Sequence, residues 1–217
     1  MPLPTVSFAT YLTNIDVRWR DDDFNALKFV KAIKGLPVIK FALVPVCGTV
    51  RRLEQHNAEQ AIDWYGEMAS ACLRNRNPQP PLIFVPIPNS SCAVTNENVP
   101  RTLRLAGALA ARFESATVSD ILRWKEVMLP SSRGGTRNPQ ILYDNLVLTT
   151  QPPTTQVILI DDVRTTGAHL IAAAAKLAEA STPSSLAICA ARTVLNQNEA
   201  PFSLLEENLA DFVPPQR

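Results

Sequence analysis

Glycine and closely spaced cysteines are scarce in this sequence. Among 217 residues there are 7 glycines against 18 prolines, so many turns are expected to be fixed by proline. No repeat or low-complexity tract stands out. The four cysteines, Cys47, Cys72, Cys92 and Cys189, lie far apart, and no Cys-x-x-Cys pair is present. The sequence therefore gives no indication of a zinc finger or a redox motif, and it favours reduced thiols in the cytoplasm.

The sequence also lacks an excess of charge of one sign, and it lacks long apolar runs. The formal net charge is +1, which gives no general argument for binding to nucleic acid or to a membrane. No apolar run approaches the roughly 20 residues of a membrane-spanning helix. Residues 1–10 have no basic start and contain Pro2 and Pro4, unlike a signal peptide. With 46% hydrophobic residues, the chain is expected to form one cytoplasmic α/β domain with additions, and no membrane contact.

The most informative stretch covers residues 156–180. A continuous apolar run at 157–160, mostly β-branched, predicts a strand that is buried on both faces. Two acids follow at its carboxyl end, and a short polar turn then leads into a strongly helix-forming segment from 168 to 180. The residues that this corner places at a candidate site are Asp161, Asp162, Val163, Arg164, Thr165, Thr166, Gly167 and Ala168.

Each part of this corner suits one part of a sugar phosphate. The N-terminus of a helix has unpaired N–H groups and a partial positive charge, so it can hold a phosphate. Gly167 lets the backbone approach a ligand closely, and Thr165 and Thr166 offer hydroxyl donors. The carboxylates of Asp161 and Asp162 suit sugar hydroxyls, or a hydrated Mg²⁺ ion, which prefers oxygen ligands. The corner therefore predicts a site for a ribose 5-phosphate group.

This corner resembles the phosphoribosyl pyrophosphate (PRPP) signature of type I phosphoribosyltransferases. That signature is an apolar run, two acids, an apolar position, a variable position and then Thr-Thr-Gly, and residues 157–167 match it without a gap. The resemblance implies a Rossmann-like central parallel sheet flanked by helices, with a divergent N-terminal α+β addition and a flexible hood or flap. It also implies that the turn holds the 5′-phosphate, and that Asp161 and Asp162 hold the ribose hydroxyls, directly or through Mg²⁺.

The second informative stretch is a predicted strand at 82–85, which ends in a polar loop. A helix is expected from 101 to 113, with Pro100 at its start. In the family that this chain resembles, the loop after the first core strand binds pyrophosphate. The resemblance therefore implies pyrophosphate binding by Pro88, Asn89 and Ser90, with Arg101 nearby for charge.

A polar segment between 124 and 145 carries a Gly-Gly pair flanked by Arg133 and Arg137. The resemblance implies a flap here that closes over the reacting centre, excludes water and brings both arginines toward pyrophosphate. A plain exposed loop is the alternative.

Beyond these stretches, we expect residues 1–77 to be an N-terminal extension whose two helices, about 24–33 and 55–76, pack on a core at 78–195. A tail at 196–217 is expected to hold a short helix around 202–212. Further strands are expected at 15–19, 38–46, 116–123, 146–150 and 185–194.

For several basic side chains the sequence allows either a surface position or a role at the site. Lys28, Lys31 and Lys34 share one helix face, which is either solvated surface or an anionic contact, near the site or with nucleic acid. Arg192 lies near the carboxyl end of its strand, where it meets either a ligand or solvent. For His56, a capping or surface role is favoured over catalysis.

The resemblance implies transfer of ribose 5-phosphate from PRPP to an unidentified nitrogen acceptor, with release of pyrophosphate. Thr165 stands where family members acting on 6-oxopurines carry an acid, which argues against hypoxanthine or guanine. The pattern is closest to the ComF-like (competence-associated) branch, although the Cys-x-x-Cys module usual there is missing. The alternative is a non-catalytic PRPP or nucleotide sensor that acts through a protein or nucleic-acid partner. A homodimer also stays open.

Overall fold

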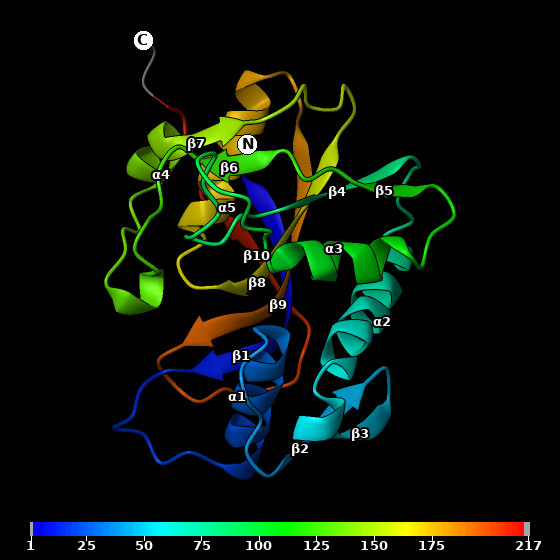
Figure 1. Cartoon of the computed structure of the whole chain (residues 1–217). Coiled ribbons are helices and arrows are strands. Elements are labelled where there is room, and N and C mark those ends of the chain that lie inside the picture. Colours follow the sequence, from blue (N-terminus) through cyan, green and yellow to red (C-terminus); the bar gives the residue numbers. More distant parts are fainter. Residues whose placement is uncertain (1, 215–217) are drawn as a thin grey trace.

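A six-stranded sheet forms the centre of the fold, in the order β10-β1-β9-β8-β4-β5. The computed structural model describes residues 2–214, without the side chain of Ser132. Every neighbouring pair of strands is parallel except β10 with β1. This confirms the expected α/β architecture with a mostly parallel central sheet (Figure 1). The strands are β1 (Leu3–Leu12), β4 (Leu82–Pro86), β5 (Ala116–Val118), β8 (Val157–Arg164), β9 (Ser184–Val194) and β10 (Leu205–Leu209).

Two hydrophobic cores cover the two faces of this sheet, and β8 contributes to both. Ile158 and Ile160 pack into the first core, whereas Val157 and Leu159 pack into the second. This alternation is what a strand covered on both faces requires. The first core also includes side chains of α1 (Asp21–Ile33), α2 (Gln60–Arg74) and α3 (Thr102–Ala110). The second includes side chains of α4 (Pro139–Asn145) and α5 (Ala168–Glu179). Among residues 2–214, no helix is both long and apolar enough to cross a membrane.

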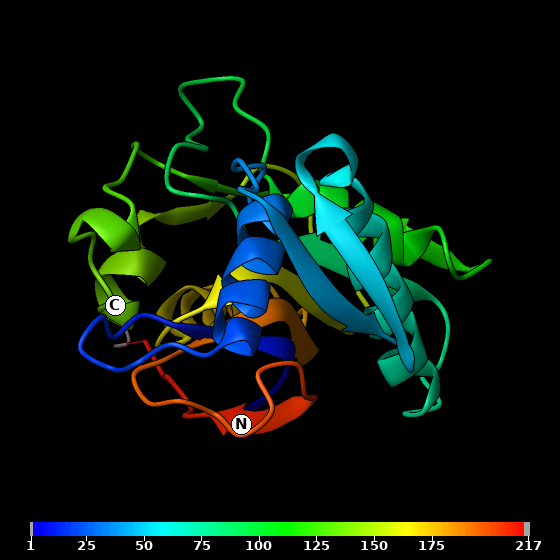
Figure 2. The ribbon, with the colours of Figure 1, turned by 90° about the horizontal axis from the view of Figure 1, so that it is seen from below.

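Two smaller sheets lie outside the central one. The hairpin of β2 (Phe41–Val46) and β3 (Thr49–Glu54) lies beside α1 and α2, as Figure 2 shows from below. Residues alternate along β2 between exposed and buried, so one face of the hairpin packs on the helices. The expected strand at 116–123 is instead two short strands, because β5 ends at Val118 and β6 (Leu122–Trp124) pairs with β7 (Leu146–Leu148). Two short 3-10 helices, Gln55–Asn57 and Ser131–Arg133, complete the elements of the described chain.

Both ends of the chain differ from the sequence-based expectation. The predicted strand at 15–19 is wrong, because β1 covers Leu3–Leu12 and lies between β9 and β10. The predicted helix around 202–212 is also wrong, because Leu205–Leu209 forms β10, antiparallel to β1. Both β1 and β10 form by pairing with strands that are distant in the sequence, and a local residue pattern does not reveal such pairing. Segments on either side of residues 78–195 thus contribute strands to the same sheet.

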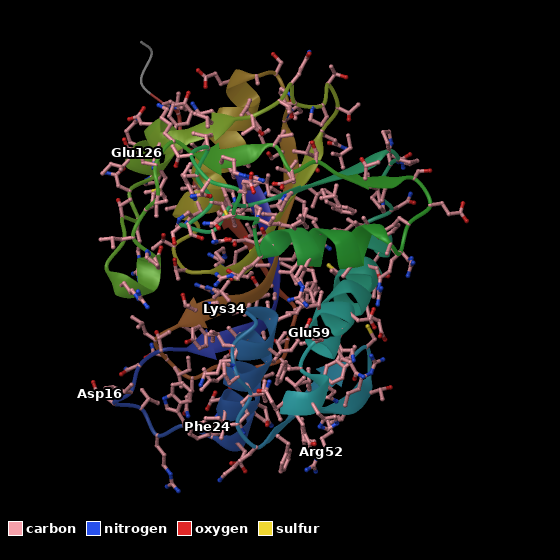
Figure 3. All side chains as sticks on the ribbon, viewed as in Figure 1. Asp16, Phe24, Lys34, Arg52, Glu59 and Glu126 are labelled. Atoms are coloured by element: carbon pink, nitrogen blue, oxygen red, sulfur yellow. The ribbon has the colours of Figure 1, made fainter. Side chains whose placement is uncertain are left out.

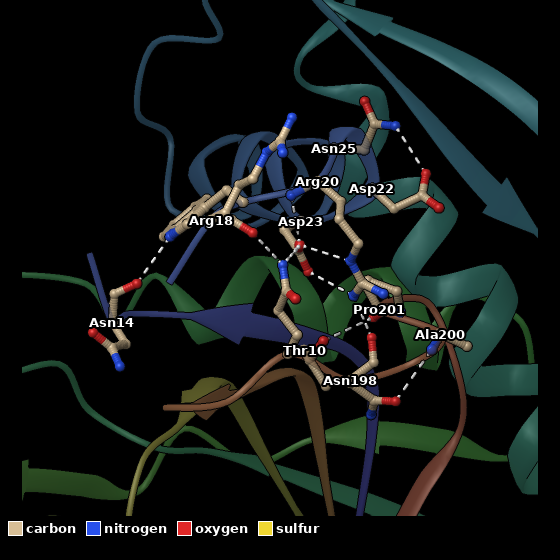
Figure 4. A network of polar contacts seen from close by, with 12 residues as sticks. Thr10, Asn14, Arg18, Arg20, Asp22, Asp23, Asn25, Asn198, Ala200 and Pro201 are labelled. Atoms are coloured by element: carbon tan, nitrogen blue, oxygen red, sulfur yellow. Dashed lines mark hydrogen bonds and ion pairs between the residues drawn. The ribbon is translucent and has the colours of Figure 1, made fainter. Parts of the chain in front are cut away.

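A buried acid ties the segment before α1 to the loop after β9. The side chain of Asp23 is 2% exposed. It accepts hydrogen bonds from the Arg20 backbone N–H (2.9 Å), the Arg20 guanidinium (3.0 and 3.1 Å) and the Gln197 amide (3.1 Å), as Figure 4 shows. Burial alone would raise the pKa of Asp23, but the hydrogen bonds from Arg20 outweigh it and hold the pKa below its usual value.

We expect Asp23→Asn to lower the free energy of unfolding by about 1–3 kcal/mol, because it weakens a set of buried charged hydrogen bonds. Asp22→Asn is the matched control, since Asp22 is an exposed acid in the same helical turn, and its carboxylate accepts a hydrogen bond from the Asn25 amide (3.4 Å). Urea unfolding of both variants measures the difference. Equal destabilisation by the two variants would contradict a structural role for the Asp23 network.

Candidate functional site

The candidate site lies where the carboxyl ends of β4 and β8 meet. The chain leaves β4 through α3 toward β5, and it leaves β8 through α5 in the opposite direction toward β9. In open α/β sheets, such a reversal leaves a crevice in which ligands bind. A cavity of about 560 Å³ occupies this position. The predicted site residues that line it are Pro88, Asn89, Ser90, Arg101, Arg137, Asp161, Asp162, Val163, Thr165 and Thr166.

Four predicted site residues do not line the cavity. Arg133 is exposed and lies outside it, although Arg137 of the same segment lines it. Arg164 is buried and forms an ion pair with Glu207 of β10. Gly167, the last residue of the turn at 165–167, and Ala168, the first residue of α5, are buried. The structure therefore divides the predicted phosphate-binding stretch into side chains that face the cavity and residues that support them.

The turn at 165–167 carries α5 into the cavity wall. Gly167 precedes the first residue of α5 with a φ of 84°, a left-handed conformation that favours glycine. The Thr166 hydroxyl accepts a hydrogen bond from the Ala168 N–H (3.4 Å), and the Gly167 carbonyl accepts from the Ile171 N–H (2.9 Å). This geometry brings the Thr165 and Thr166 side chains and the N-terminal turn of α5 to the cavity.

The two acids at the end of β8 lie in different environments. Asp162 is buried, and its carboxylate forms an ion pair with the Arg101 guanidinium at 2.9 Å. Asp161 is half-buried, and one of its oxygens accepts a hydrogen bond from the Asp162 N–H at 2.8 Å. Burial and the adjacent charge of Asp162 raise the pKa of Asp161 to about 8, against the opposing charges of Lys34 and Arg101. Ionisation of both acids at once is therefore unfavourable unless a cation compensates their charge.

The loop after β4 is shaped by the side chain of Asn89. Its carbonyl oxygen accepts hydrogen bonds from the Arg101 backbone N–H (3.1 Å) and the Cys92 thiol (3.2 Å), and its amide donates to the Ser91 hydroxyl (2.6 Å). The Trp124 indole N–H donates to the backbone carbonyls of Pro88 (3.2 Å) and Asn89 (3.1 Å). The Asn89 side chain therefore holds the loop in shape, and Ser90 lines the cavity beside it.

His169 lines the cavity and was missed by sequence reasoning. It lies in the first turn of α5, two residues after Gly167, and its ring packs edge-on against Trp124 at 5.6 Å. Burial lowers the pKa of His169, although the charge of Asp162 acts in the opposite direction, so the imidazole is neutral at pH 7. The available sequence signal was the position of His169 in the first turn of the helix that follows the acid pair.

The N-terminal segment and β9 also line the cavity. Tyr11 and Thr13 lie at the end of β1, Thr193 lies in β9, and Lys34 lies at the end of α1 opposite Phe24 (Figure 3). Lys34 thus lines the cavity, which is one of the two alternatives predicted for the lysine face. No local signal indicates Tyr11 or Thr13, because their position depends on the pairing of β1 with β9.

The remaining basic candidates lie away from the cavity. Lys28 donates to the Phe41 carbonyl (2.7 Å). Arg192 forms an ion pair with Glu207 (2.7 Å). His56 is exposed and contacts Glu54 (3.2 Å). All four cysteines are free, and of these only Cys47 is exposed.

Comparison of the chain with models of known protein families finds no match, and comparison with curated protein sequences finds no significant match. Functional assignment therefore depends on the chemistry of the cavity.

The raised pKa of Asp161 gives a prediction about stability. Because the pKa is about 8 in the folded protein and near 3.8 in an ordinary carboxyl, ionisation disfavours the folded state increasingly as the pH rises between these values. In the absence of divalent cations, Asp161→Asn should therefore stabilise the protein by about 2–4 kcal/mol at pH 8 and by little at pH 4. Thermal unfolding across this range measures the effect, and a pH-independent difference would contradict it.

Proposed function

We propose that this protein binds PRPP with Mg²⁺ and transfers ribose 5-phosphate to a nitrogen acceptor with release of pyrophosphate, as type I phosphoribosyltransferases do. One observation carries the proposal. The acid pair, the Thr165–Thr166 turn at the start of α5, and the loop at 88–90 with Arg101 all border one cavity of about 560 Å³. Ligand cavities commonly measure about 300–1,000 Å³, so this cavity suits a ligand of that size.

Each group in the cavity has a role in this proposal. The turn and the helix N-terminus hold the 5′-phosphate, and the acids accept hydrogen bonds from the ribose hydroxyls. The backbone at 88–90, together with Arg101 and Arg137, holds pyrophosphate. Arg101 and Asp162 neutralise each other at 2.9 Å without ligand. PRPP would replace that ion pair, because its pyrophosphate takes Arg101 and its ribose takes Asp162.

The acid pair also suits Mg²⁺. This ion is usually bound by one or two protein carboxylates together with phosphates and water, and Asp161 and Asp162 supply such carboxylates, directly or through water. Within residues 2–214 there is no group of three or more potential metal ligands, so PRPP and water would complete the coordination. When bound, Mg²⁺ supplies positive charge that stabilises the leaving pyrophosphate. Burial and the adjacent charge of Asp162, which raise the pKa of Asp161, make ionisation of both acids costly, and a cation at this place would relieve that cost.

The protein would then act by positioning and charge neutralisation. The acceptor nitrogen attacks the anomeric carbon as the bond to pyrophosphate breaks, and the flap excludes water from this reactive centre. The acceptor would enter beside Tyr11, Thr13 and Lys34, which also line the cavity. Because Thr165 stands in place of an acid, we do not expect a 6-oxopurine as acceptor.

A non-catalytic PRPP or nucleotide sensor is the second candidate. It would use the same binding contacts and pass the signal to a protein or nucleic-acid partner. The placement of Arg133 favours this candidate, because that flap arginine is exposed and lies outside the cavity. Transfer would require the flap to close, whereas sensing would not.

We expect the double variant Asp161→Asn, Asp162→Asn to lose PRPP affinity by about 100-fold or more, since both ribose acceptors lose their charge. Asp21→Asn with Asp22→Asn is the matched control, because it removes two adjacent exposed acids far from the cavity in α1. Calorimetry with Mg²⁺ present measures both. Unchanged affinity in the first variant would refute the site.

Release of pyrophosphate, measured with a panel of bases and amines, separates the two candidate functions. Release that depends on one acceptor supports the transferase. Tight PRPP binding without release for any acceptor supports the sensor.

A further inference from the structure

Strand β10 contacts the phosphate turn from behind at two places. Its residues alternate in exposure, so Leu205, Glu207 and Leu209 share the less exposed face, while Glu206 and Asn208 are exposed. Glu207 meets the residue just before the turn, Arg164, and Leu209 meets the last residue of the turn, Gly167. An edge strand formed by the C-terminal segment thus touches both ends of the turn at 165–167.

The first contact is a cluster of charges. The Arg164 side chain is 6% exposed and forms an ion pair with Glu207, whose other oxygen lies 2.7 Å from the Arg192 guanidinium. One carboxylate therefore faces two arginines, from the carboxyl ends of β8 and β9. Burial lowers the pKa of Arg164, which shows how strongly this guanidinium depends on compensation. A buried charge that loses its partner must move toward water, and here it would displace the start of the turn.

The second contact is steric. A Cβ atom at Gly167 would come within 2.7 Å of both terminal methyl groups of Leu209. The Leu209 side chain, 6% exposed, therefore fills the space directly against the turn. Any shift of the turn toward β10 would meet the Leu209 side chain. A shorter side chain at this position would leave the turn unsupported.

We propose that β10 positions the phosphate-binding turn, with Glu207 and Leu209 as positioning residues for a phosphate monoester such as the 5′-phosphate of ribose 5-phosphate. The identity of this ligand rests on the proposed function, whereas the support of the turn does not. Glu207 holds the turn's first end through Arg164, and Leu209 holds its second end through Gly167. A ligand phosphate then meets a turn that needs little reorganisation, which strengthens binding.

The test compares Glu207→Gln with Glu206→Gln, which removes the same charge from the neighbouring position on the opposite face of the strand. Glu206 pairs instead with Arg76, at 2.7 Å. Two properties are measured: amide hydrogen exchange at 165–168, and calorimetric affinity for ribose 5-phosphate and for inorganic pyrophosphate. We expect Glu207→Gln to speed exchange at 165–168 and to weaken ribose 5-phosphate binding by about tenfold, while pyrophosphate binding stays within about twofold. Glu206→Gln should change none of these.

The proposal would be overturned if Glu207→Gln and Glu206→Gln showed the same amide exchange and the same affinity for ribose 5-phosphate. It would also be overturned if Glu207→Gln weakened the binding of ribose 5-phosphate and of pyrophosphate equally. If Glu207→Gln does not fold, Leu209→Val replaces it, with Leu205→Val as its control on the same face of β10. If the wild-type protein binds neither ligand, the proposed function fails. Amide exchange at 165–168 still decides whether β10 positions the turn.

Discussion

The burial of β8 on both faces is the constraint on which the rest of the structure depends. Its apolar residues enter two separate cores, so its only polar side chains lie at its carboxyl end. The helices that follow β4 and β8 cover opposite faces, and the crevice opens between these strands. The acid pair, the turn and the loop at 88–90 meet there because the sheet leaves no other place for them.

The site carries electrostatic cost in the absence of ligand. Burial and the adjacent charge of Asp162 raise the pKa of Asp161 to about 8, while Arg101 is held by Asp162. The first feature favours binding of a cation, whereas the ion pair holds Arg101 beside Asp162 until a ligand replaces it. Groups with such perturbed pKa values in a cavity are typical of functional sites, which is why the same residues carry the functional proposal. On the far side of the turn, Glu207 balances the buried charge of Arg164.

Sequence reasoning predicted the elements whose signal is local. It predicted β8 from its apolar run, the helix after Gly167 from its helix-forming residues, and α1 and α2 from periodicity. It ended the strand before the acid pair, whereas β8 continues to Arg164, and it started the second helix at 55, whereas α2 begins at Gln60. It missed β1, whose buried positions include Thr5, Ser7 and Thr10 and so lack an apolar pattern. It also missed β10, which forms through pairing with β1 across the length of the chain. The cavity wall at Tyr11 and Thr13 could not be predicted, because it follows from that pairing.

The most direct test of the central claim is a crystal structure of the protein with PRPP and Mg²⁺. The account predicts the 5′-phosphate within hydrogen-bond distance of Thr165 or Thr166, the ribose hydroxyls at Asp161 and Asp162, and Arg101 parted from Asp162 and contacting pyrophosphate. PRPP bound elsewhere, or a cavity that stays empty at saturating PRPP with the Arg101–Asp162 pair intact, would contradict it.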